Sequence, residues 1–518
     1  MLGLAVLLFL GRLAQLQLIF GRQNRQLADE NRIKKTAEPA PRGIIFDRHG
    51  RPLVGNQPVY RIKIDDVFKT ISRQEALAIE AQTDSQTEMR VDMGREYFFG
   101  PVLAHVLGYL SEASPKEVQS GQSQLGDLVG RTGVEEYYES RLRGVNGGVI
   151  VEVDSVGQKI RDIGRVSVVT GEDLHLSIDA ALSQKAYELL EKWGGKKPGA
   201  VVISEAPTGR LLALVSYPSF DPGQITPEKL ADPQRPFFDR ALSGVYAPGS
   251  TFKVVSSTAG LEEGRISAST RYQDTGFIKI GDYLYYNWLY TQRGEAEGEI
   301  DLVYALKRST DTFFYKVGEW VGARRLADWA RAFGFGEPTG IDLPNESSGL
   351  VPDPDWKQKT LGESWFLGNT YHFAIGQGDL LVTPLQLNTM MSVIANDGVL
   401  CAPRVVEAKA ASEGGGKSCK NLQLKPETLS LIKEGLRQAC ATGGTAWPLF
   451  DFEPAVVCKT GTAEVDDGSD DTHAWLTAYA PAIEPQIVVT VLVERGGEGS
   501  DVAAPVVREI LKYFFENS

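Results

Sequence analysis

The chain has 518 residues, of which 42% are hydrophobic and 23% are charged, and its formal net charge is −13. This length allows roughly three domains of about 150 residues each, and the composition is that of an ordinary globular protein. The acidic balance argues against nucleic acid as a partner, because nonspecific binding to DNA or RNA depends on Lys and Arg side chains that neutralise phosphates.

The first twenty residues, MLGLAVLLFLGRLAQLQLIF, are apolar apart from Arg12 and two glutamines. Their length suits a spanning helix, and we predict a single membrane anchor over residues 1–21. A cleaved signal peptide fits less well, because no basic residues precede the run and no A-x-A site follows it. A buried soluble helix is a third alternative. Basic residues follow the run, so the positive-inside rule alone would place the bulk of the chain in the cytoplasm.

Residues 22–170 predict a mixed N-terminal domain of elongated form, the pedestal. The stretch Arg42–Ile64 alternates apolar runs with turn residues, and Arg48-His49-Gly50 predicts a hairpin turn within it. The stretch Gly148–Val169, GVIVEVDSVGQKIRDIGRVSVV, predicts a second β-hairpin.

Residues 171–518 show a different pattern, with longer strands and helices. Strands are predicted at 174–178, 200–204, 211–216, 456–464, 474–480 and 487–494. Helices are predicted at 179–193 and 503–515, and a long, mostly helical insert separates the two groups of strands. Strands from both ends of the region with helices between them indicate one α+β domain around an antiparallel sheet.

Ser250-Thr251-Phe252-Lys253 is the first motif that suggests chemistry. Pro248-Gly249 ends the preceding segment and Ser250 opens a predicted helix, so Lys253 lies on the same face one turn later. A serine hydroxyl becomes a nucleophile when a base takes its proton, and a desolvated lysine near another positive charge can be that base. Alone, the motif more often marks a helix-capping serine followed by a solvated lysine, and about one such match is expected by chance.

Ser309-Thr310-Asp311 follows the helical stretch DLVYALKRS. We predict that Ser309 passes a proton between Lys253 and a leaving amine, and that Asp311 holds a lysine or the substrate backbone. The alternative for this motif is an ordinary helix cap.

Lys459-Thr460-Gly461-Thr462 lies on a predicted strand. We predict that Lys459 and Thr460 bind a substrate carboxylate, and that Gly461 lets the ligand backbone approach closely. The backbone N–H groups of Thr462 and Ser250 would form an oxyanion hole, in which one donor typically lowers the barrier by about 3–4 kcal/mol. The alternative is an edge strand with a protective lysine and a glycine bulge.

The cysteines and histidines point to no metal centre. Four cysteines permit three pairings, and the spacing does not choose among them; they are Cys401, Cys419, Cys440 and Cys458. Cys458 sits in the apolar run AVVC, which predicts a buried free thiol. The five histidines are scattered without metal-ligand spacing, so we predict neither a metal nor a cofactor.

Together, in this order, the three motifs resemble the site of penicillin-binding proteins and serine β-lactamases, and the chain resembles the class B penicillin-binding proteins over nearly its whole length. Further matching segments are Arg42–Arg48, Gly130–Glu135, Tyr246–Ser250, Ile375–Gly378, Thr383–Gln386 and His473–Trp475. Within the family the chain is most similar to the elongation type, penicillin-binding protein 2, through Phe335–Leu343, Trp365–Gly368 and Asp311, where most of the family carry asparagine. The head region, roughly Val67–Met93, is shorter than in the family pattern.

The resemblance implies a penicillin-binding/serine β-lactamase-like transpeptidase domain on a pedestal. It implies a D,D-transpeptidase that cross-links peptidoglycan stem peptides through an acyl-enzyme on Ser250, with β-lactams acylating the same serine. The implied partners are a SEDS-type membrane glycosyltransferase and elongation scaffold proteins. The implied topology is single-pass in the cytoplasmic membrane with the catalytic domain outside, against the positive-inside signal.

Three alternatives share much of this pattern. A β-lactamase or β-lactam sensor has the same fold but needs no pedestal, and it would hydrolyse benzylpenicillin instead of remaining acylated. A division-type class B transpeptidase has the same chemistry and a different partner. A non-enzymatic scaffold with a degenerate site is disfavoured because all the motif residues are present.

Overall fold

The computed structural model describes residues 2–22, 32–64, 67–81, 89–123, 126–154, 159–407, 419–465 and 467–517. The chain divides into two compact units. The smaller unit holds Met1–Ile45, Val54–Glu96 and Tyr138–Leu174, and the larger holds Phe46–Leu53, Tyr97–Tyr137 and His175–Ser518.

The chain begins with helix α1 (Leu2–Ala14), which continues into a π-helical turn at Gln15–Ile19. Its large apolar side chains, such as Leu7, Leu8 and Phe9, are exposed. In the part of the chain that the structure describes, no helix is both long enough and apolar enough to cross a membrane. The membrane anchor therefore stays a prediction.

The smaller unit contains a three-stranded antiparallel sheet in the order β1-β8-β9. Its strands are β1 (Ile33–Glu38), β8 (Gly147–Val153) and β9 (Lys159–Val166). β8 and β9 confirm the hairpin predicted over Gly148–Val169. β3 (Pro52–Ile64) pairs with β4 (Val67–Ile71) and with β5 (Met89–Tyr97). Helix α3 (Arg73–Glu80) follows β4 within the predicted head region, of which residues 82–88 lie outside the described residues.

The turn predicted at Arg48-His49-Gly50 follows β2 (Ile45–Phe46). Gly50 has a φ of 77° and donates its N–H to the Asp47 carbonyl oxygen. The Asp47 carboxylate accepts the backbone N–H groups of His49 and Arg51, both at 2.8 Å. An aspartate that caps its own turn and a glycine with positive φ are the local causes of this reversal.

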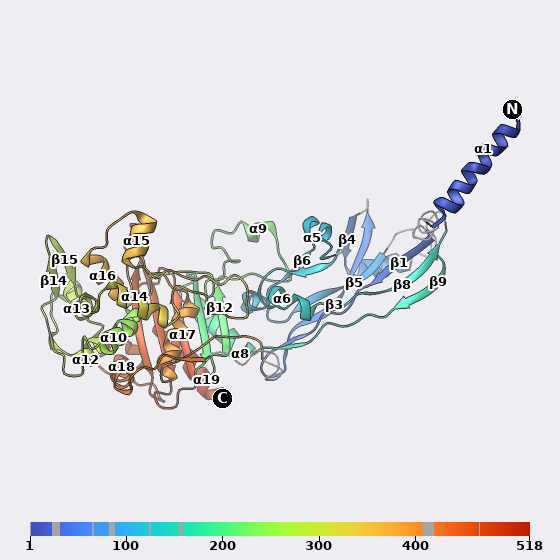
Figure 1. Ribbon diagram of the computed structural model, residues 1–518. Helices are drawn as coiled ribbons and strands as arrows, with labels where there is room; N and C mark the ends of the chain where they lie inside the picture. Colours follow the sequence, from blue (N-terminus) through green and yellow to red (C-terminus); the bar gives the residue numbers. More distant parts are fainter. Residues whose placement is uncertain are drawn as a thin grey trace. The chain divides into compact units, whose positions relative to one another are not determined.

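The core of the larger unit is a five-stranded antiparallel sheet in the order β12-β11-β21-β20-β19 (Figure 1). Its strands are β11 (Gly199–Glu205), β12 (Leu211–Tyr217), β19 (Val457–Glu464), β20 (Thr472–Ala480) and β21 (Ile487–Val493). These strands confirm the predicted sheet, in which β21 from the end of the chain pairs with β11 from the start of the domain. β19, which carries Lys459, lies at one edge.

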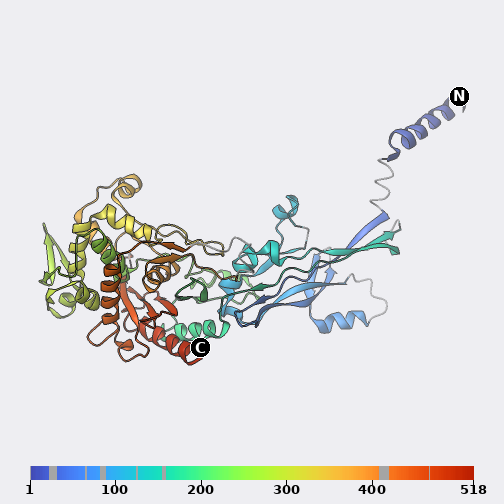
Figure 2. The ribbon, with the colours of Figure 1, turned by 60° about the horizontal axis from the view of Figure 1, so that its bottom comes forward.

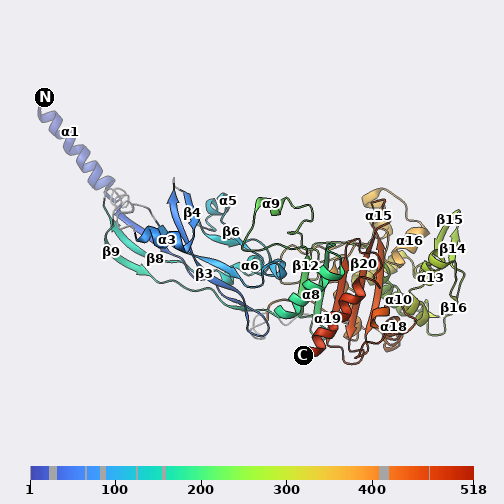
Figure 3. The same cartoon turned by 180° about the vertical axis from the view of Figure 1, so that it is seen from behind.

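Helices α8 (Ala180–Trp193) and α19 (Ala503–Asn517) cover one face of this sheet, as Figure 3 shows. Asp179 caps α8 by accepting the N–H groups of Ala181 and Leu182. Leu189, Ile510 and Leu511 belong to the apolar cluster between these helices and the sheet. The apolar stripes of both helices therefore face the strands, as their sequence period predicts.

The helical insert covers the other face (Figures 1 and 2). Its main helices are α10 (Lys253–Glu262), α12 (Leu302–Arg308), α13 (Asp311–Val321), α14 (Ala323–Ala332), α16 (Leu367–Ala374), α17 (Pro384–Ala395) and α18 (Pro426–Ala439). Phe252, Phe313 and Phe373 are among the buried aromatic side chains of this second cluster. The sheet with its helical insert is the α+β architecture expected from the sequence.

Short elements complete the described part of the chain. The other helices are α4 (Ala104–Leu107), α5 (Pro115–Gln119), α6 (Gly133–Tyr137), α7 (Glu139–Leu142), α9 (Pro227–Leu230), α11 (Trp288–Arg293) and α15 (Pro354–Leu361). The short strand pairs are β6 (Leu110–Glu112) with β7 (Leu128–Gly130), β13 (Tyr272–Asp274) with β16 (Gly298–Ile300), β14 (Phe277–Ile280) with β15 (Tyr283–Tyr286), and β17 (Val399–Cys401) with β18 (Cys419–Asn421). β10 (Leu174–His175) is shorter than the predicted strand 174–178.

All four cysteines are paired, as Cys401–Cys419 and Cys440–Cys458. The prediction of a free thiol at Cys458 was therefore wrong. Cys458 does lie in an apolar environment on β19, but the end of α18 brings Cys440 beside that strand. A pairing between a helix end and a strand depends on tertiary packing, which cysteine spacing does not reveal.

Candidate active site

The predicted nucleophile, Ser250, lies in a 3₁₀ turn (Gly249–Phe252) that leads directly into α10. The sequence predicted that Ser250 opens an α-helix, and the structure places one tighter turn before it. A spacing of three residues still puts Ser250 and Lys253 on one side, because side chains three apart eclipse in a 3₁₀ turn. Ser250 is partly exposed, whereas Lys253 is fully buried.

Glycines explain how this turn packs against its neighbours. Gly249 has a φ of 54° and donates its N–H to the carbonyl oxygen of Gly376 at 2.9 Å. A Cβ on Gly249 would lie 2.6 Å from the carbonyl oxygen of Thr462, which is closer than real contacts allow. Gly376 has a φ of 77°, and a Cβ there would lie 2.1 Å from the Gly249 carbonyl oxygen, so both positions require glycine.

The edge strand β19 lies against the same turn through Gly461. A Cβ on Gly461 would lie 2.9 Å from the Thr251 methyl group and 3.0 Å from the Pro248 carbonyl oxygen. Trp475, opposite Gly461 on β20, donates its indole N–H to the Ala247 carbonyl oxygen at 3.0 Å. The sheet edge therefore holds the turn that carries Ser250, and Gly461 allows the two to approach.

Lys253 contacts two residues of the second motif. Its Nζ lies 2.6 Å from Asp311 Oδ1, 2.7 Å from the Ser309 carbonyl oxygen and 3.2 Å from Ser309 Oγ. Burial lowers the pKa of Lys253 below the ordinary lysine value, and the Asp311 carboxylate opposes this shift. Lys253 is thus closer to giving up its proton than a lysine in water.

Lys459 approaches the same hydroxyl from the sheet. Its Nζ donates to Ser309 Oγ at 2.8 Å and to the Thr460 carbonyl oxygen at 3.0 Å. The pKa of Lys459 is lowered well below the ordinary value, first by burial and then by the charge of Lys253, while Asp311 opposes the shift. Ser309 Oγ therefore lies between two buried amines.

The backbone between α12 and α13 places this second motif. Ser309 adopts a left-handed conformation (φ 59°, ψ 36°), which is uncommon for a residue with a side chain. Asp311 is the first residue of α13, where the helix dipole favours a negative charge. A non-glycine residue held in this conformation at a cluster of charges is typical of a functional site.

The three remaining predicted residues lie on β19. Thr460 Oγ1 lies 2.8 Å from Thr445 Oγ1, and Thr462 Oγ1 donates to Glu498 Oε2 at 2.7 Å. The structure thus brings all eight predicted residues into one region, around the turn at Ser250, the start of α13 and β19. Thr445 and Glu498 were not predicted, because no motif distinguishes them from other loop residues.

Two further residues that the sequence did not identify contact Asp311. The backbone N–H of Trp288 donates to Asp311 Oδ2 at 3.0 Å. The side-chain oxygen of Asn287 accepts the backbone N–H of Asp311 at 3.1 Å. Asn287 is the N-cap residue of helix α11 and Trp288 is its first residue, some twenty positions before the motif, and one sequence offers no signal for this contact.

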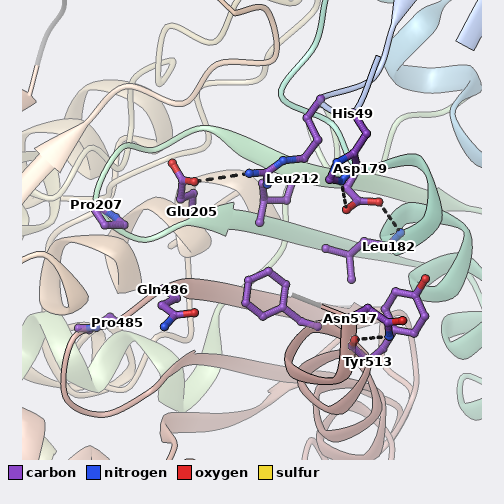
Figure 4. Close-up of a pocket in the computed structure, with 12 residues that line it drawn as sticks. His49, Asp179, Leu182, Glu205, Pro207, Leu212, Pro485, Gln486, Tyr513 and Asn517 are labelled. Carbon is purple, nitrogen blue, oxygen red and sulfur yellow. Dashed lines mark hydrogen bonds and ion pairs between the residues drawn. The ribbon is translucent and has the colours of Figure 1, made fainter. Parts of the chain in front are cut away.

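A pocket of about 400 Å³ lies elsewhere in the larger unit, and none of the eight predicted residues lines it (Figure 4). Its charged groups are already paired: His49 with Asp179 at 3.1 Å and Arg48 with Glu205 at 3.9 Å. The chemistry of the motifs therefore belongs to the cluster of Lys253, Lys459, Ser309 and Asp311, called the lysine cluster below, and not to this pocket. Within the described ranges, no group of three or more His, Cys, Asp or Glu side chains could hold a metal; the absence of a metal stays a prediction.

Family models match two segments of the chain. Residues 199–512 match the penicillin binding protein transpeptidase domain, and residues 66–176 match the penicillin-binding protein dimerisation domain. The first segment contains all three motifs.

Relatives and solved structures agree with these matches. The chain is 30% identical to the peptidoglycan D,D-transpeptidase MrdA of Escherichia coli (strain K12), over 99% of this chain and 92% of the relative. Its fold is similar to that of PBP2 from Helicobacter pylori, in the structure of PBP2 in complex with MreC. The TM-score is 0.83 and the identity is 28%, and the match covers 94% of this chain and 99% of the PBP2 chain. It is also similar to a chain of a peptidoglycan synthase complex that coordinates polymerisation and cross-linking, with a TM-score of 0.80, 30% identity, and coverage of 100% and 97%. The chain therefore belongs to the penicillin-binding proteins, and within them to the penicillin-binding protein 2 type.

Proposed function

We propose that this protein is a serine D,D-transpeptidase that cross-links peptidoglycan stem peptides during cell-wall elongation. The observation that carries this proposal is the Ser309 hydroxyl, held 3.2 Å from Lys253 Nζ and 2.8 Å from Lys459 Nζ beside the turn of Ser250. Two buried amines with lowered pKa joined by one hydroxyl form a proton path, as acyl transfer to and from a serine requires.

In the acylation step, Ser250 Oγ attacks the carbonyl carbon of the D-Ala-D-Ala peptide bond. The neutral amine of Lys253 takes the hydroxyl proton as the new C–O bond forms. When the tetrahedral intermediate collapses, the C–N bond breaks, and the proton passes through Ser309 to the leaving amine. The terminal D-Ala departs and the stem peptide remains as an ester on Ser250.

In the transfer step, an amine of a second stem peptide attacks this ester and the same groups act in reverse. The oxyanion of each intermediate would be bound by the backbone N–H groups of Ser250 and Thr462. Because β19 is an edge strand, an extended stem peptide can add to it through backbone hydrogen bonds. Lys459 and Thr460 would bind the terminal carboxylate, and Gly461 leaves this edge without a side chain.

The test is covalent labelling of the purified protein with a fluorescent penicillin, followed over several hours. We expect a stable adduct with the wild type and none with Ser250→Ala. Ser256→Ala is the matched control: Ser256 lies on α10, is buried, and donates its hydroxyl to the carbonyl oxygen of Ala374, at the end of α16, at 2.6 Å. It should label like the wild type.

The other outcomes separate the alternatives. An adduct that decays quickly would identify a β-lactamase, although the dimerisation-domain match at residues 66–176 favours a transpeptidase. An adduct that persists in Ser250→Ala would refute the assignment of the nucleophile. A wild type that forms no adduct would leave a scaffold or a wrongly assigned site.

The proposal extends to domains and location. We assign residues 1–21 to a single membrane anchor, 22–170 to the pedestal and 171–518 to the transpeptidase domain, outside the cytoplasmic membrane. Support comes from the exposed Leu7, Leu8 and Phe9 of α1, and from the two disulfides, which form in oxidising compartments. A membrane-impermeant amine reagent should label the larger unit in spheroplasts; labelling only after lysis would refute this orientation.

The proposed partners are a SEDS-type glycosyltransferase and elongation scaffold proteins. The PBP2 structure of H. pylori is a complex with MreC, and the related synthase complex couples polymerisation to cross-linking. Depletion in the native host tests this role. Round cells are expected, whereas filaments would indicate the division-type alternative.

A further inference from the structure

Asp274 is a buried carboxylate that the mechanism above does not use. Its side chain is 1% exposed and lies at the end of β13. Four donors surround it, two on each oxygen. Oδ1 accepts from the Gly276 N–H at 3.0 Å and the Thr312 hydroxyl at 2.6 Å, and Oδ2 accepts from the Glu297 N–H at 2.8 Å and Asn287 Nδ2 at 3.3 Å.

Two of these contacts lead to the lysine cluster. Thr312 is the neighbour of Asp311 in the first turn of α13. Asn287 is fully buried, and its amide spans the gap between two residues: Nδ2 donates to Asp274, and Oδ1 accepts the Asp311 backbone N–H at 3.1 Å. Asp274 therefore fixes which way the Asn287 amide faces, because only its NH₂ side can donate to a carboxylate.

We propose that Asn287, oriented by the buried carboxylate of Asp274, is a positioning residue that holds Asp311 in place against Lys253. This inference rests on the proposed function, since it assumes that Lys253 is the base that activates Ser250. Neither Asn287 nor Asp274 touches the reacting atoms. Their effect reaches the reaction through the 2.6 Å contact between Asp311 Oδ1 and Lys253 Nζ.

The geometry explains why such support is needed. The Asp311 carboxylate is held at one oxygen by Lys253 and at the other by the Trp288 N–H. Trp288 directly follows Asn287, so the start of α11 holds Asp311 through both its backbone and its side chain. If the Asn287 amide is lost, the Trp288 contacts remain but the Asp311 backbone loses its support, so the start of α13 can shift against α11. A displacement of 1 Å at a reacting group can cost about 100-fold in rate.

The first experiment compares the wild type with Asn287→Ala. Stopped-flow acylation by fluorescent penicillin gives the rate constant of acylation and the dissociation constant separately. We expect the acylation rate constant to fall between about 10-fold and 100-fold, with the dissociation constant unchanged. An unchanged rate constant would overturn the proposal.

Asn388→Ala is the matched control for loss of a buried asparagine. Asn388 is 1% exposed and contacts Ser204, Thr490 and two backbone carbonyls on the sheet, far along the chain from the motifs. We expect it to lower the thermal midpoint and leave the acylation rate constant of the folded protein at the wild-type value. If it slows acylation as much as Asn287→Ala does, the effect is general destabilisation and the proposal fails.

A double-mutant cycle tests the pairing of the two residues. Asn287→Ala removes the donor of their hydrogen bond and Asp274→Ala removes the acceptor, so each single variant should slow acylation. Because Asp274 acts through Asn287, we expect the double variant to be at least tenfold faster than additivity of the single effects predicts; strict additivity would overturn the pairing.

A pH profile separates positioning from a structural role. Lys253 faces the Asp311 carboxylate on α13, the Lys459 amine on β19 and the uncharged Ser309 hydroxyl. Because Asp311 raises the pKa of Lys253, its displacement in Asn287→Ala should move the acidic limb of the acylation profile to lower pH. A profile that keeps its shape and only loses amplitude would contradict the proposal.

Failure of this inference is distinguishable from failure of the proposed function. If Ser250→Ala still labels, the proposed function is wrong, whatever Asn287→Ala does. If Ser250→Ala is inert and Asn287→Ala reacts like the wild type, the function stands and the positioning role is wrong.

Discussion

The two faces of the large sheet are both buried, but they bury different chemistry. Under α8 and α19 lies a continuous apolar cluster that includes Val489 and Leu511. The face toward α10 and α13 also has an apolar cluster, but this one surrounds Lys253 and Lys459, both fully buried. The first face contributes only to the free energy of unfolding. On the second face, the burial of two amines away from water lowers the free energy of unfolding.

The alternation of side chains on β19 produces this difference within two residues. Cys458 packs into the cluster under α8 and α19, and the next residue, Lys459, points to the opposite face. Taking an ammonium group out of water costs several kcal/mol even after relaxation. The same burial is the main cause of the lowered pKa of Lys459.

The largest change in the difference between the two faces is expected when Lys459 is replaced by an apolar residue of similar length. For Lys459→Met we expect acylation by penicillin to fall by about 10²–10⁴-fold, the range for losing a proton-transfer group. We also expect the free energy of unfolding to rise by about 1–2 kcal/mol, as is common when a functional group no longer has to be buried. Stopped-flow labelling and urea denaturation measure the two effects.

Lys512→Met is the control for a lysine-to-methionine change. Lys512 lies on α19 with a side chain that is 56% exposed, so neither rate nor stability should change appreciably. A Lys459→Met variant that is less stable than the wild type would show that the buried amine contributes more through its hydrogen bonds than its desolvation costs.

A truncation on the apolar face should have the opposite signature. Leu511 is fully buried on α19, and Leu511→Ala should lower the free energy of unfolding by about 2–5 kcal/mol. The acylation rate constant of the folded fraction should stay at the wild-type value, because this face contributes no group to the site. Leu230→Ala, at a position 62% exposed, is the neutral control; a slower rate in Leu511→Ala would show that the two faces are coupled through the sheet.

The sequence predicted the framework of the site because its parts follow local rules. Ser250 and Lys253 share a side through helical spacing, and apolar alternation marks β19 and β21 as strands. Membership of one site followed from a family resemblance of the three motifs, since nothing local joins Lys459 to Ser309 across 150 residues.

Other parts of the site are not encoded in local patterns. The Cys440–Cys458 pair and the contact between Asn287 and Asp311 join segments that meet only in the folded tertiary structure. The role of Asp274 could not be predicted from the sequence either, because a single aspartate at the end of a short strand is usually a turn residue. What the sequence missed is therefore the support behind the motifs and not the motifs themselves.

The smallest predicted effect is a pH dependence of the stability gained by Lys459→Met. In the wild type, the folded chain holds Lys459 at a pKa well below the ordinary 10.5. Between these two values the unfolded chain binds a proton that the folded chain lacks, so the stability of the wild type rises with pH. Lys459→Met has no such proton, so its advantage should shrink as pH rises toward 10.5. Urea midpoints of both proteins across this range measure the gap. A gap that widens with pH would mean that the pKa of Lys459 is raised. In that case the charge of Asp311 outweighs the effect of burial, and this face of the sheet stabilises the charged form of its amines.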